Sequence, residues 1–120
     1  MGKILVIDDE ESLRSILSRL LTLEDYKVLE AGDAKEAMSI IEREEVQVII
    51  SDVKLPDANG VELVPKLKER LPLCEIIVLT AYGTIQDGVQ AIKSGAFDYI
   101  TKGDEDNKII PLVQKAMEKA

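Results

Sequence analysis

Short apolar runs alternate with amphipathic, helix-like segments five times along the 120 residues, and no other feature constrains the fold as strongly. The middle run, Val46 to Ile50, is rich in β-branched residues, and Asp52, Pro56 and Asn59-Gly60 follow it. Such a run predicts a strand covered on both faces, and proline with Asn-Gly predicts a backbone break after it. Strands that alternate with helices predict an α/β fold with a parallel sheet.

The order of the strands follows from their composition. The second run contains charged residues and the fifth alternates polar with apolar residues, whereas the other three are almost wholly apolar. We therefore expect the second and fifth strands at the sheet edges, in the order 2-1-3-4-5 of a flavodoxin-like doubly wound fold with five strands and five helices. One domain is predicted over residues 1–120.

Two helix starts carry local signals. Asp33 and Glu36 have the spacing of a capping box at the start of the second helix. Pro65 falls inside the apolar stripe of the third helix, so we expect that helix to start late or to be kinked.

The fourth helix is predicted to be the weakest. Ile85, Val89 and Ile92 form only a thin apolar face, and three glycines lower its helix propensity. Gly95 is expected to be its C-cap. This helix is a candidate for a part that moves, and the alternative is a surface helix of low stability.

Composition excludes several functions. The formal charge of -8 argues against direct binding of nucleic acid, which needs a basic surface. The chain has no histidine, so an imidazole base, a histidine metal ligand and a phosphohistidine on this chain are excluded. Cys74 is the only cysteine, which rules out an internal disulfide, suits a reducing compartment and indicates a packing residue. No apolar run has the length of a membrane span, and no signal peptide is recognised, so we expect a cytoplasmic location and no membrane partner.

Acidic residues follow the first and third predicted strands. Asp8 and Asp9 follow the first strand, and Asp52 follows the third. If these strands are parallel neighbours, their carboxyl ends meet and the three carboxylates converge. A hard divalent cation with oxygen ligands, Mg²⁺ being the best candidate, would relieve their repulsion. The alternative is that these acids only cap turns and helices.

Two further polar side chains stand at the ends of the fourth and fifth strands. Thr80 supplies a hydroxyl group and Lys102 an ammonium group. Together with the acids and a cation they would form an anion site beside a carboxylate. A phosphoryl group is the ligand that needs all of these groups.

These residues, in this order and at these strand ends, resemble the pattern of the receiver domain of two-component response regulators, and the resemblance covers essentially all of the chain. It implies that Asp52 is the phosphoacceptor. It also implies that Asp9 binds Mg²⁺ directly and Asp8 through water, and that Asp52 and the backbone carbonyl of Lys54 complete the protein ligands.

The resemblance further implies a switch. Thr80 and Lys102 would contact the phosphoryl oxygens, and Tyr99 matches the aromatic switch position. Thr80 would move toward the phosphoryl group and Tyr99 would turn into the space it leaves. The surface of the last two helices and the last strand would then change, and a homodimer could form through the same surface. The resemblance implies a regulatory domain that catalyses only its own phosphoryl transfer, not an enzyme with turnover.

The stretch TAYGTIQDGVQAIKSGAFDYITK is particularly similar to receivers of the NtrC-type enhancer-binding transcription activators. This similarity implies a sensor histidine kinase as phosphoryl donor. It also implies ATPase and DNA-binding output domains after the receiver, which would control transcription.

One residue departs from the family pattern. Gly103 follows Lys102 where receivers usually have proline after a cis bond. Without proline a cis bond costs about 2.5 to 4 kcal/mol, so we expect a trans bond or a mobile loop. Lys54 and Tyr82 lie two residues after the acid and the threonine, and we expect them to shield the phosphoryl group from water and to tune its lifetime.

Three alternatives stay open at this point. A degenerate receiver would act as an interaction module without phosphorylation. An aspartate-nucleophile phosphohydrolase would have a second acid where this chain has Lys54, and a flavin-binding electron carrier would have a Ser/Thr/Gly-rich phosphate cradle, which the loops lack.

Overall fold

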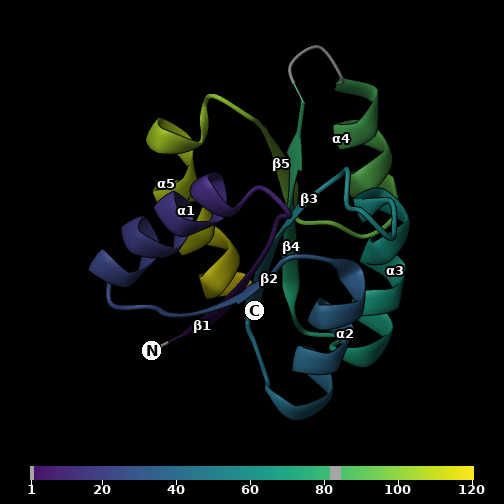
Figure 1. Ribbon diagram of the computed structural model, residues 1–120, viewed down its shortest axis with the longest axis horizontal. Coiled ribbons are helices and arrows are strands. Elements are labelled where there is room, and N and C mark those ends of the chain that lie inside the picture. The colour runs from purple at the N-terminus through teal and green to yellow at the C-terminus, as the bar shows by residue number, and fades with distance from the viewer. Residues whose placement is uncertain (1, 82–84) are drawn as a thin grey trace.

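The computed structural model describes residues 2–81 and 85–120, except for the side chains of 105–107. Strands and helices alternate along these residues (Figure 1). The elements are β1 (Lys3–Ile7), α1 (Glu11–Leu23), β2 (Lys27–Ala31), α2 (Ala34–Arg43), β3 (Val48–Asp52), α3 (Gly60–Arg70), β4 (Glu75–Thr80), α4 (Ile85–Lys93), β5 (Asp98–Thr101) and α5 (Glu105–Lys119).

The five strands form one parallel sheet in the order β2-β1-β3-β4-β5, which confirms the predicted topology. The mixed-polarity strands β2 and β5 lie at the edges, and the apolar strands lie between them. Ile7 of β1 is in register with Ser51 of β3, so the residues that follow these two strands leave the sheet side by side. This register brings the acids of the first and third strands to one edge.

Helices cover both faces of the sheet: α1 and α5 lie on one face, and α2, α3 and α4 on the other (Figure 1). Because side chains alternate along a strand, Leu5 and Ile7 pack toward the second group of helices, whereas Ile4 and Val6 pack toward α1 and α5. The central strands thus need apolar residues on both faces. This requirement explains their continuous apolar runs.

The start of α2 carries the predicted cap. The Asp33 carboxylate accepts a hydrogen bond from the Glu36 N–H at 2.7 Å, and the Glu36 carboxylate accepts one from the Gly32 N–H at 2.7 Å. The second bond reaches one residue further back than in the usual capping box.

Of the two expectations for α3, a late start or a kink, the late start is wrong. The helix begins at Gly60, where the Asn59 side chain accepts a hydrogen bond from the Val61 N–H at 2.8 Å. Pro65 lies in the second turn with an exposed side chain. The buried apolar face of α3 and this cap outweigh the one backbone donor that proline lacks.

The apolar stripe of α4 faces away from the sheet. The stripe consists of Ile85, Val89 and Ile92, whose exposed fractions are 62%, 43% and 44%. The residues of α4 that are buried instead are the small Gly88 and Ala91. Gly95 follows the helix with a φ of +114° and donates its N–H to the carbonyl of Ile92, as expected of a C-cap residue.

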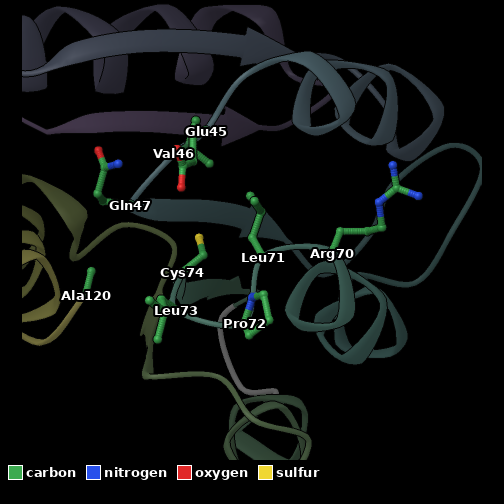
Figure 2. A pocket seen from close by; sticks show the side chains of 9 residues that line it. All are labelled: Glu45, Val46, Gln47, Arg70, Leu71, Pro72, Leu73, Cys74 and Ala120. Carbon is green, nitrogen blue, oxygen red and sulfur yellow. The ribbon is translucent and has the colours of Figure 1, made fainter.

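A pocket of about 280 Å³ lies at the end of the sheet opposite the acids. The segments before β3 and β4 line it, together with Ala120 (Figure 2). Cys74 lies in its wall, and burial raises the pKa of this thiol to about 12. A thiol with this pKa is a packing residue rather than a nucleophile, in agreement with the prediction.

None of the helices among the described residues has the length and apolar character needed to cross a membrane.

Candidate functional site

The carboxyl ends of four strands build the site. Asp8 directly follows β1, Asp52 is the last residue of β3, Thr80 the last of β4, and Lys102 directly follows β5. Thr80 pairs with Thr101 across the sheet, so Lys102 leaves β5 beside the end of β4. The parallel topology thereby gathers side chains that lie up to 94 residues apart in the sequence.

The three predicted acids converge. One carboxylate oxygen of each of Asp8, Asp9 and Asp52 lies within 4.8 Å of the others. Asp8 is completely buried, Asp52 is 5% exposed, and Asp9 is exposed at the rim. Two buried carboxylates beside a third form a strongly negative, partly dehydrated site.

Lys102 supplies the positive charge. Its Nζ donates a hydrogen bond to Oδ2 of Asp52 at 2.8 Å and lies 3.7 Å from both Oδ2 of Asp8 and Oε2 of Glu10. Burial alone would lower the pKa of Lys102. The hydrogen bond and charge of Asp52, with the charges of Asp8 and Glu10, outweigh burial and raise the pKa above its ordinary value. Lys102 is therefore a firmly charged cation held against Asp52.

Its surroundings disfavour the charged form of Asp8. Burial raises its pKa, and repulsion from Asp52 adds to this, while the hydrogen bond from the Glu10 N–H and the charge of Lys102 oppose it. Its Oδ2 is buried and has no hydrogen-bond partner within the described part of the chain. A buried carboxylate oxygen without a donor, beside two other carboxylates, fits a hard divalent cation.

The turn after β3 is closed tightly around Asp52. The Lys54 N–H donates to Oδ1 of Asp52 at 3.3 Å, Lys54 forms a bridge with Asn59, and the Gly60 N–H donates to the carbonyl of Val53 at 2.6 Å. A Cβ at Gly60 would overlap the carbonyl oxygen of Asp52, so only glycine permits this approach. The Lys54 side chain is exposed, so the backbone of Lys54 is the part that contacts Asp52.

Thr80 and Tyr99 occupy neighbouring strands. Thr80 is 1% exposed, and its hydroxyl has no hydrogen-bond partner among residues 2–81 and 85–120. Tyr99 is half-buried, with its ring packed so closely on Gly88 of α4 that a Cβ there would overlap it. The buried hydroxyl of Thr80 and the aromatic ring of Tyr99 thus lie on adjacent strands, β4 and β5.

Two supporting residues were not predicted. Arg14 of α1 donates from Nη1 to the carbonyl of Asp8 at 2.7 Å and from Nε to the Glu30 carboxylate at 2.9 Å. Asp57, in the turn after β3, accepts hydrogen bonds from the first residues of α2. Position on the first helix, one turn past the acids, was the signal for Arg14, whereas Asp57 looks like an ordinary turn residue.

The loop after Lys102 agrees with one of the two expectations. The Lys102-Gly103 peptide bond is trans, and Gly103 has a φ of +102°. Lys102 nevertheless reaches Asp52, so the missing proline does not prevent its placement. The predicted role of Tyr82 concerns a residue that lies outside the described part of the chain.

Sequence comparison identifies relatives. Residues 4–114 match the family model of the response regulator receiver domain. Response regulator protein PilR of Pseudomonas aeruginosa is 34% identical over 115 residues, which are 96% of this chain and 26% of PilR. The DNA-binding transcriptional regulator NtrC of Proteus hauseri is 30% identical over 116 residues, 97% of this chain and 24% of NtrC. The chain thus spans about a quarter of the length of the curated relatives it matches.

Solved structures agree with this assignment. A receiver domain from Clostridium thermocellum superposes with a TM-score of 0.92 at 29% identity, over 99% of this chain and 96% of that one. A response regulator from Burkholderia pseudomallei, solved with a phosphorylated aspartic acid, calcium ion and citrate, has a TM-score of 0.84 at 31% identity, over 100% and 74% of the two chains. The match over residues 4–114 shows that this chain belongs to the response regulator receiver domain family, and its relatives include regulators of the NtrC type.

Proposed function

We propose that this chain is a phosphorylation-dependent signalling switch in which Asp52 accepts the phosphoryl group. The observation that carries the proposal is the placement of Asp52 between the ammonium group of Lys102, at 2.8 Å, and the carboxylates of Asp8 and Asp9. A nucleophile, a cation for the phosphoryl oxygens and an acidic metal site meet at one sheet edge. The phosphorylated aspartic acid in the Burkholderia relative supports this assignment.

The proposed metal site holds Mg²⁺ through Asp8, Asp9, Asp52 and the backbone carbonyl of Lys54. The orphaned oxygen of Asp8 and the all-oxygen donor set suit this ion, and the calcium ion in the Burkholderia structure is of the same hard class. Bound Mg²⁺ would neutralise the acids against the incoming phosphoryl dianion.

The residues of the chain have separate parts in the transfer. A carboxylate oxygen of Asp52 attacks phosphorus, the bond between phosphorus and the donor atom breaks, and the donor leaves with the electron pair. The Nζ of Lys102 donates a hydrogen bond to Oδ2 of Asp52, and this ammonium group stabilises the charge on the phosphoryl oxygens. Thr80 supplies a hydroxyl donor to the same oxygens. The product is an aspartyl phosphate, formed once per domain, so the chain acts as a regulatory phosphoacceptor and not as an enzyme with turnover.

The proposed readout uses Thr80 and Tyr99. The hydroxyl of Thr80, which has no hydrogen-bond partner within the described residues, gains one when it binds the phosphoryl group, and Tyr99 turns into the space that Thr80 leaves. The surface of α4, β5 and α5 would then change, and a homodimer would form through it. The exposed apolar residues of α4 support a contact there, as Ile85, Val89 and Ile92 are all solvent-accessible.

The proposed partners follow from the relatives. The donor is a sensor histidine kinase, the partner that membership of the response regulator receiver domain family implies. The PilR and NtrC relatives are about four times as long as this chain. We therefore infer that output domains follow the receiver domain of residues 1–120. The similarity to NtrC-type regulators supports ATPase and DNA-binding domains, which control transcription in the cytoplasm. The receiver itself does not contact nucleic acid, since it carries a charge of -8.

The test is intact mass after incubation with acetyl phosphate. We expect a gain of one phosphoryl group in the presence of Mg²⁺, no gain with a chelator, and no gain in Asp52→Asn. The same amount of gain in Asp52→Asn would refute the acceptor. No gain under any condition would instead favour a degenerate receiver that acts as an interaction module.

A further inference from the structure

Asp57 joins two loops that belong to different β-α units. It lies in the turn between β3 and α3, yet its carboxylate binds the amino-terminal end of α2. Oδ1 accepts a hydrogen bond from the Ala34 N–H at 2.9 Å, and Oδ2 accepts one from the Lys35 N–H at 3.0 Å. These bonds lower the pKa of Asp57, which stays a carboxylate in the folded protein.

The end of α2 is shared between two acids. Within the described part of the chain, the carboxylate of Asp33, the N-cap residue, accepts a hydrogen bond only from the Glu36 N–H, so the first two N–H groups of the helix depend on Asp57. Asp57 does not cap its own helix, because Asn59 does so for α3. Its carboxylate therefore serves as a connection between the turn after β3 and α2.

The turn that Asp57 anchors is closed on itself. The Leu55 N–H donates to the carbonyl of Ala58 at 3.1 Å, and Lys54 and Asn59 form a bridge. Asp57 lies between these paired residues, so a tether at its side chain restrains the whole turn. The turn includes Lys54, whose carbonyl is the one backbone ligand of the proposed Mg²⁺ site.

We propose that Asp57 is a positioning residue, which fixes the turn after β3 against α2 and thereby holds the Lys54 carbonyl in place for Mg²⁺. The metal part of this inference rests on the proposed function. Asp57 itself has an exposed side chain and takes no part in the transfer. Partners that orient metal ligands in this way contribute to affinity although they never touch the ion.

The chain offers a matched control, because Asp33 binds the same helix end without a link to the turn. We would measure Mg²⁺ affinity by calorimetry on the wild type, Asp57→Ala and Asp33→Ala. We expect Asp57→Ala to weaken Mg²⁺ binding about tenfold, the lower end for residues that orient ligands, and Asp33→Ala to leave it unchanged. Equal weakening in both variants, or none in Asp57→Ala, would overturn the inference.

A second measurement does not depend on the metal. Amide hydrogen exchange at Leu55 and Gly60, whose N–H groups close the turn, should become severalfold faster in Asp57→Ala and stay unchanged in Asp33→Ala. Unchanged exchange in Asp57→Ala would refute the tether. If the wild type bound no Mg²⁺, the proposed metal site would fail, and faster exchange would still support the positional role of Asp57.

Discussion

Asp8 shows most clearly how single residues of this site oppose the stability of the fold. Its carboxylate is completely buried, lies in a cluster with Asp52 and Asp9, and has the charge of Lys102 at 3.7 Å from one oxygen. Burial and the neighbouring acid disfavour its charged form, and the raised pKa records this cost. A neutral residue at position 8 would meet less repulsion than the Asp8 carboxylate does.

Replacing Asp8 with asparagine removes this cost. Asp8→Asn keeps the shape and the acceptor for the Glu10 N–H but removes the charge. We expect the variant to be more stable than the wild type at pH 7 without divalent cations, by about 1 kcal/mol in urea unfolding. Asp9→Asn, at the exposed rim, is the control and should change stability much less. A destabilised Asp8→Asn variant would contradict this account of the cluster.

The charge of Asp57, in contrast to that of Asp8, stabilises the fold, and this makes stability depend on pH. The N–H groups of Ala34 and Lys35 lower its pKa from the ordinary value of 3.8. An acid whose pKa is lower in the folded than in the unfolded state stabilises the folded protein at pH values above its unfolded-state pKa. This contribution is lost as the pH falls through the folded-state pKa. The free energy of unfolding should therefore fall less steeply below about pH 4 in Asp57→Asn than in the wild type. Parallel pH profiles would show that the two hydrogen bonds do not persist in solution.

At the scale of elements, α4 makes a close contact with β5 that decides which of its residues face the sheet. Its small residues Gly88 and Ala91 face the sheet, and the ring of Tyr99 lies directly on Gly88. This contact turns the larger apolar residues of α4 outward. The position of the Tyr99 ring and the packing of α4 on the sheet are therefore coupled through Gly88.

Gly88→Ala tests this coupling. Alanine favours a helix by about 1 kcal/mol over glycine, so an unconstrained position would become more stable. Here the added Cβ overlaps the Tyr99 ring, and overpacking costs about 1 to 3 kcal/mol. We expect net destabilisation by about 1 kcal/mol in urea unfolding, together with shifted NMR signals of the Tyr99 ring. Gln90→Ala, on the exposed side of α4, is the control and should be neutral or stabilising. A stabilised Gly88→Ala variant would contradict the contact.

The elements also show how far the sequence could predict the structure. Strand order, the Asp33 cap and the Gly95 C-cap followed from local composition and turn chemistry, and the structure agrees. The orientation of α4 did not, because it depends on a tyrosine 11 residues away that fills the space over Gly88. The start of α3 was missed because the Asn59 cap and the buried face outweigh Pro65.

The residues of the site divide in the same way. Asp8, Asp9, Asp52 and Lys102 stand at strand ends, so topology alone brings them together. Asp57 reaches its partners through a turn whose shape depends on tertiary hydrogen bonds between loops. Sequence periodicity contains no information about such bonds.

At the scale of the whole molecule, a bound cation should act on the folding equilibrium. The unfolded chain does not hold the three acids together, so the proposed Mg²⁺ ion would bind only the folded state and stabilise it. At a concentration 100 times the dissociation constant the gain is about 2.7 kcal/mol. We expect the thermal midpoint to rise with Mg²⁺, to return to its starting value with a chelator, and to respond much less in Asp9→Asn. A midpoint that does not depend on Mg²⁺ in the wild type would contradict the metal site.

The most direct test of the account identifies the residue that carries the phosphoryl group. After incubation with acetyl phosphate and Mg²⁺, borohydride reduces an aspartyl phosphate to homoserine, and peptide mass spectrometry locates the reduced position. We predict that borohydride reduction occurs at position 52 alone, that it requires Mg²⁺, and that it is less extensive when Lys102 is replaced by alanine. Reduction at Asp8, Asp9 or Asp57, or at no residue, would contradict the proposal that this sheet edge is a phosphoacceptor site built around Asp52.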